Sequence, residues 1–89
     1  MEALRRTYCE GLQTQIQALS QGLPRLDDEA VAHEIRELAH RLRGSGAAYG
    51  FPAITAAAAM VESAPPRELA DRVDDLTLAL RAARREVGL

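Results

Sequence analysis

Apolar residues recur at helical spacing along almost the whole 89-residue chain, and this periodicity limits the folds that the chain can adopt. The β-branched and aromatic residues that strands favour are sparse, whereas Ala, Leu, Arg and Glu dominate the sequence. Hydrophobic residues make up 47% of the chain, which is enough to build the core of one small domain. We therefore predict a single all-α domain that covers residues 1–89.

Glycine, proline and aspartate mark where the first helix ends and the second begins. The first helix should end near Gln21, because Gly22 and Pro24 follow it. Asp27 or Asp28 can then cap the second helix. The apolar stripes of these helices are Leu4, Tyr8, Leu12, Ile16 and Leu19 in the first, and Val31, Ile35, Leu38 and Leu42 in the second.

The second helix contains two potential breakers, Gly44 and Gly46, but its apolar stripe continues past both of them. At about 100° per residue, Tyr49 returns to the face on which Val31 lies. We therefore predict that the helix continues to Tyr49 and that Gly50 lies just past its end.

Prolines delimit the last two helices. Pro52 suits the first turn of a third helix, which should end before Pro65 and Pro66. Four helices with short connections predict an antiparallel, up-down four-helix bundle. The inward-facing residues are Phe51, Ile54, Ala58 and Val61 in the third helix, and Leu69, Val73, Leu76, Leu80, Ala83 and Val87 in the fourth.

Composition argues against several classes of protein. The 11 basic and 13 acidic residues nearly balance and aromatic residues amount to 3%, so we expect no nucleic-acid binding. The sequence has no long apolar run, so we expect no membrane contact, no secretory signal and a cytoplasmic location. Cys9 is the only cysteine, which excludes an internal disulfide and suggests a small helix residue.

His40 is predicted to lie on the outer face of the second helix. It falls about 180° from Val31, opposite the apolar stripe. Arg36 and Arg43 lie four residues before and three residues after it, within reach of the space beside its ring. Gly44, one turn later, leaves bare backbone there. An exposed histidine between arginines can be an ordinary solvated face, but it can also receive a phosphoryl group.

The chemistry of such a transfer fits these residue types. Neutral imidazole is a nucleophile near physiological pH and attacks through one ring nitrogen. The other nitrogen should donate to an acceptor that fixes the tautomer. Phosphoryl transfer also needs positive charge around the phosphoryl oxygens, which Arg43 and Arg36 can supply.

The stretch from His40 to Phe51, HRLRGSGAAYGF, resembles the signature of histidine-containing phosphotransfer (Hpt) domains. The resemblance implies that His40 is the phosphoacceptor, that Arg43 takes the place usually held by lysine, and that Gly44 provides clearance for a partner. Arginine at this position departs from the usual pattern: it keeps the charge of lysine, but its head is bulkier and planar.

A carboxylate on the third helix extends the resemblance. In the phosphotransfer domain of the chemotaxis histidine kinase, a glutamate on the next helix holds the non-reacting nitrogen of the acceptor, and Glu62 occupies the corresponding place. Its helical phase, about 20° from Phe51, sets it close to the apolar stripe. Glu62 should therefore accept a hydrogen bond from His40, the alternative being a carboxylate that reaches water. Ala59 stands where that kinase domain has a second histidine.

The resemblance implies a phosphorelay carrier and not an enzyme. His40 would accept a phosphoryl group from the phospho-aspartate of a response-regulator receiver domain, or from a sensor histidine kinase, and pass it on. Gly44 and Arg41 would contribute to partner clearance and docking. We expect a monomer without a cofactor. We also expect no metal of its own, because a receiver domain normally brings its own magnesium ion.

Two other readings remain at this point. His33, Glu37 and His40 share one helical face and could bind a metal, although the nearby arginines would repel a cation. Alternatively, the bundle could be an adaptor that binds a partner without chemistry. Ser45 and Gly46 are expected to be structural.

Overall fold

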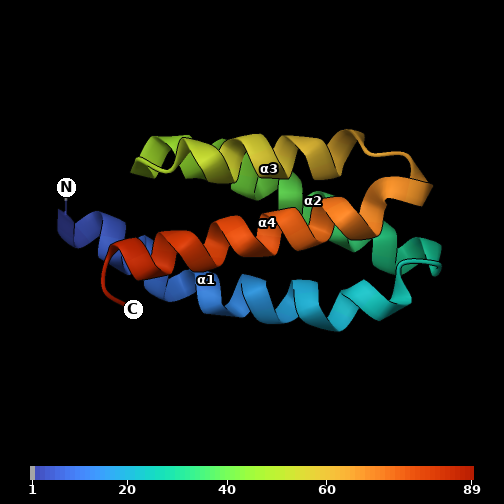
Figure 1. Cartoon of the computed structure of the whole chain (residues 1–89), viewed down its shortest axis with the longest axis horizontal. Helices are drawn as coiled ribbons and strands as arrows, with labels where there is room; N and C mark the ends of the chain where they lie inside the picture. The colour runs from blue at the N-terminus through green and yellow to red at the C-terminus, as the bar shows by residue number, and fades with distance from the viewer. Residues whose placement is uncertain (1) are drawn as a thin grey trace.

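The computed structural model describes residues 2–89 and has the predicted four helices. They run up and down along the long axis of a body measuring 38 × 20 × 17 Å, and both ends of the chain lie at the same end of the bundle (Figure 1). Each helix packs against the next, and α1 packs against α4. The elements are α1 (Glu2–Gly22), η1 (Leu23–Arg25), α2 (Glu29–Gly46), η2 (Ala47–Tyr49), α3 (Pro52–Ser63) and α4 (Pro66–Glu86).

The core consists of apolar side chains from all four helices, which confirms the predicted bundle. Most of the predicted stripe residues are fully buried, including Leu12, Ile35, Ile54, Leu76 and Leu80. No polar or charged side chain in residues 2–89 is fully buried. None of the described helices is both long enough and apolar enough to cross a bilayer.

The prediction for Leu4 was wrong, because 58% of this residue is exposed. Arg5 takes the inner place at this end of the bundle. Its guanidinium carbon lies 4.5 Å from the centre of the Phe51 ring, and its Nε donates to the carbonyl oxygen of Tyr49. A cation over an aromatic ring therefore closes the core where the apolar stripe was expected to continue.

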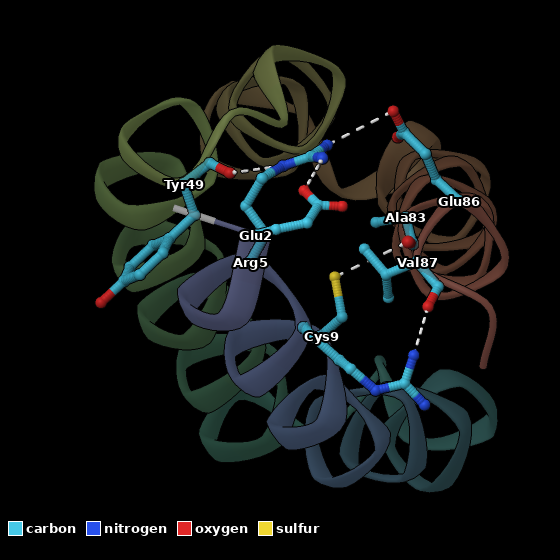
Figure 2. A network of polar contacts seen from close by, with 8 residues as sticks. Glu2, Arg5, Cys9, Tyr49, Ala83, Glu86 and Val87 are labelled. Atoms are coloured by element: carbon cyan, nitrogen blue, oxygen red, sulfur yellow. Dashed lines mark hydrogen bonds and ion pairs between the residues drawn. The ribbon is translucent and has the colours of Figure 1, made fainter.

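Polar contacts fasten α1 to the end of α4, as Figure 2 shows. Arg5 pairs with Glu86 at 3.3 Å, and Arg6 donates to the carbonyl oxygen of Val87 at 2.6 Å. Cys9 is fully buried, and its thiol donates to the carbonyl oxygen of Ala83. Burial raises the pKa of this thiol, so little of the reactive thiolate forms and Cys9 acts as a core residue.

The α-helical part of α2 ends at Gly46, three residues before the predicted end at Tyr49, and the chain continues as the tighter turn η2. A regular helix would bond the amide of Ala47 to the carbonyl of Arg43. At this end of α2, the Thr55 hydroxyl accepts from the Ala47 amide at 2.8 Å and donates to the Arg43 carbonyl at 2.9 Å. Gly50 then ends the turn with φ of 89°, a left-handed conformation suited to glycine.

The close approach of α2 and α3 requires a glycine at position 46. A Cβ atom there would lie 2.9 Å from the Ile54 Cβ and 2.9 Å from the Thr55 amide nitrogen. The second of these atoms belongs to the backbone, so it cannot move aside without displacing α3. Gly46 is thus a packing residue, as predicted.

Gly46→Ala should lower the free energy of unfolding by about 1–3 kcal/mol, because the overlap outweighs the gain in helix propensity. Gly11→Ala is the matched control, since no atom lies within 4 Å of its Cβ position in the middle of α1. The control should raise the free energy of unfolding by about 0.5–1 kcal/mol. Urea denaturation followed by circular dichroism measures both changes, and equal stabilisation by both substitutions would contradict the close approach.

Candidate functional site

His40 lies on the outer face of α2, and 65% of its side chain is exposed. The residues around it in sequence, Leu38, Ala39 and Leu42, are buried in the core and fix the orientation of the helix. The helical phase thus placed the imidazole correctly on the face opposite the core. A partner can reach this ring without any rearrangement of the bundle.

Glu62 reaches His40 from the last turn of α3. The imidazole Nδ1 and the carboxylate Oε2 lie 2.9 Å apart, and 22% of the Glu62 side chain is exposed. A carboxylate only accepts hydrogen bonds, so Nδ1 must be the protonated nitrogen in this contact. In the neutral ring, Nε2 then keeps its lone pair and is the nucleophilic nitrogen.

Arg43 lies on the other side of the same carboxylate. Its Nε is 3.1 Å from Glu62 Oε1, which is the distance of an ion pair, but the geometry is not that of a hydrogen bond. Glu62 Oε1 is buried and has no hydrogen-bond partner within the described chain. Close opposite charges still attract without good hydrogen-bond alignment, so we regard the contact as an ion pair. The Arg43 side chain is 47% exposed, and its terminal nitrogens make no hydrogen bond to any described residue.

Arg36 is oriented towards the end of α3. Its Nη1 donates to the carbonyl oxygens of Val61 and Glu62, at 2.8 and 3.1 Å, and its Nη2 donates to that of Ala64 at 2.8 Å. The sequence led us to expect its charge beside the imidazole. The guanidinium does border the same depression as His40, but both of its terminal nitrogens already bind backbone.

Gly44 and Arg41 leave the surroundings of the imidazole accessible. A Cβ atom on Gly44 would meet nothing within 4 Å. Arg41 is exposed and makes no ion pair with the described residues. A shallow depression on this face is lined by His33, Arg36, Glu37, His40, Arg41 and Glu62.

The other polar residues singled out in the sequence make local contacts. His33 and Glu37 pair at 2.8 Å between Nε2 and Oε1. The described residues contain no group of three or more side chains arranged to hold a metal ion. The Ser45 hydroxyl lies 2.8 Å from the Tyr8 hydroxyl and 3.5 Å from the Leu42 carbonyl oxygen, so it connects α1 to α2.

Comparison with protein families gives a match to the Hpt domain over residues 3–86. The match includes α2, α3, α4, all of α1 except Glu2, and every residue of the site described above. Comparisons with curated proteins and with solved structures give no match.

Glu62→Ala should lower the fraction of His40 that is protonated at Nδ1, because the substitution removes the acceptor that selects this tautomer. Nitrogen chemical shifts of the two ring nitrogens, measured by NMR at a pH where the ring is neutral, report the tautomer directly. Glu37→Ala is the matched control, since it removes the carboxylate paired with His33 instead. Unchanged His40 shifts in Glu62→Ala would show that the contact is absent in solution.

Proposed function

Because the chain belongs to the Hpt domain family, whose members are phosphocarriers in phosphorelays, we propose that His40 is the residue that bears the phosphoryl group. Hpt domains exchange phosphoryl groups with receiver domains and histidine kinases, and they do so without a catalytic domain of their own. The observation that carries the assignment is the exposed imidazole whose Nδ1 is held by Glu62, at 2.9 Å.

In the proposed reaction, the lone pair of His40 Nε2 attacks the phosphorus atom of a receiver's phospho-aspartate. A nitrogen–phosphorus bond forms, the bond from phosphorus to the aspartate oxygen breaks, and the aspartate leaves as a carboxylate. The ring keeps its proton on Nδ1 and gains positive charge. The Glu62 carboxylate, already in contact with that proton, stabilises the charge. The reverse sequence returns the phosphoryl group to a receiver.

Arg43 is the proposed source of positive charge for the phosphoryl oxygens. Its Nε pairs with Glu62, whereas its terminal nitrogens are without hydrogen bonds among residues 2–89. An arginine in this arrangement can contact the carboxylate and a phosphate at once, because its donors point in several directions from one plane.

Gly44 and Arg41 are proposed to admit and orient the partner. Gly44 leaves open space one turn beyond His40, so a partner's active site can approach the ring closely. Arg41 offers a positive charge next to the acceptor, which suits the acidic pocket of a receiver domain. A docked receiver domain would bring its own magnesium ion.

His40→Gln should abolish phosphotransfer from a receiver domain that bears labelled phosphate, because glutamine has no nucleophilic nitrogen. His33→Gln is the matched control: this second histidine is also exposed on α2 and lines the same depression. The control should accept label at the wild-type rate, and the label should be labile to acid and stable to base. Label on His40→Gln would refute the assignment, and an absence of label on the wild type with every donor would favour an adaptor.

Gly44→Leu should slow phosphotransfer by about tenfold or more while leaving the fold intact, because its side chain would fill the space that a partner needs. Gly44→Ala should have a much smaller effect, since it adds a single methyl group. Transfer kinetics at several receiver concentrations, together with thermal unfolding, measure the two changes. Equal transfer rates for the leucine variant and the wild type would contradict the proposed clearance.

A further inference from the structure

The last turn of α3 lacks the donors that would normally satisfy its carbonyl groups. In a continuing helix, the amides of residues 65 and 66 would bond to the carbonyls of Val61 and Glu62. Both positions are proline, and proline has no amide hydrogen. The Glu62 carbonyl therefore depends on a donor from outside the helix, and the Val61 carbonyl receives only a long bond of 3.4 Å from the Ala64 amide.

Arg36 of α2 supplies these donors. Its Nη1 binds the carbonyl oxygens of Val61 and Glu62, whose usual amide partners Pro65 and Pro66 remove, and its Nη2 binds the carbonyl oxygen of Ala64. One planar guanidinium thus replaces the missing amides and joins the end of α3 to the middle of α2.

The same segment of α2 holds Glu62 at two points. Arg36 binds its backbone carbonyl at 3.1 Å, and His40, one turn later, binds its carboxylate at 2.9 Å. The position of the Glu62 backbone determines where its short side chain can place Oε2. Any fraying of this turn would therefore separate the carboxylate from the imidazole.

We propose that Arg36 is a positioning residue: by binding the carbonyls at the end of α3, it holds Glu62 where its carboxylate fixes the tautomer of His40. This inference rests on the proposed function of His40 and concerns how that histidine is prepared for attack. Arg36 would have to give up its hydrogen bonds to three carbonyl oxygens in order to bind a phosphoryl group directly. The positive charge of Arg36 still contributes to the electrostatic potential in the depression beside His40, but its hydrogen bonds are made to the carbonyls at the end of α3.

The test compares Arg36→Ala and Arg36→Lys with Arg84→Ala. Arg84 is the matched control, because it also joins two helices by donating to backbone carbonyls, those of Cys9 and Glu10, but it does so between α4 and α1. Two quantities are measured for each variant: the His40 tautomer in the unphosphorylated protein, from ring nitrogen shifts, and the rate of phosphotransfer from a labelled receiver domain. Circular dichroism checks the fold.

Arg36→Ala should lose the preference for protonation at Nδ1 and should transfer phosphate about tenfold to hundredfold more slowly, because the imidazole is no longer oriented. Arg36→Lys should give intermediate values, since one ammonium keeps the charge but cannot span the three carbonyls. Arg84→Ala should keep the wild-type tautomer and rate even if it lowers stability. If Arg36→Ala does not fold, the His40 tautomer and the transfer rate of Arg36→Lys test the inference alone.

A wild-type tautomer in both Arg36 variants would overturn the inference, and a rate that falls only when the charge is removed would instead assign Arg36 to the phosphate. The tautomer is measured without any phosphate present, so this result is independent of whether His40 is the acceptor. If His40 is not the phosphoacceptor, this is seen in a separate experiment, as labelled phosphate on His40→Gln.

Discussion

The packing of α2 against α3 is the contact on which the rest of the site depends, because His40 and Glu62 belong to different helices. Two polar attachments set the register of this pair. Near the end of α2, the Thr55 hydroxyl accepts a hydrogen bond from the Ala47 amide and donates one to the Arg43 carbonyl oxygen. Near the end of α3, Arg36 binds the carbonyls of Val61, Glu62 and Ala64. The imidazole lies between these attachments along α2, so a shift of either helix would change its contact with Glu62.

The charges at the site are arranged around one carboxylate. Glu62 contacts the imidazole through Oε2 and Arg43 through Oε1, and only 22% of its side chain meets solvent. The carboxylate thus contacts the imidazole on one side and a cation on the other. In the proposed reaction, the negative charge of Glu62 would offset the positive charge that the imidazole gains, and Arg43 would offset the negative charge of the phosphate. The unmodified protein already holds both of these groups at the site.

Much of the architecture could be predicted from the sequence, because the spacing of apolar residues within one helix determines which side is buried. The same reasoning placed His40 outside, and the family resemblance directed attention to Glu62. The exposure of Leu4 could not be predicted in this way, because a neighbouring arginine stacks on Phe51 and takes the inner position. The contacts of Thr55 and Arg36 could not be predicted either, because they depend on the register between helices, and the periodicity of a single helix does not determine that register. The consecutive prolines at 65 and 66 were a usable signal, because they remove the two amides that would continue the hydrogen bonding of the third helix.

The core of the bundle is apolar, whereas the site is built from surface side chains. This separation has an evolutionary consequence. Every side chain that is fully buried in the described chain is apolar, whereas His40, Arg41, Arg43 and Gly44 all lie on the outside. Substitutions on this surface remove little packing, so they change the stability of the bundle only slightly. A gene duplicate could therefore acquire a new signalling partner through a few surface changes while it retains the ancestral scaffold and its chemistry.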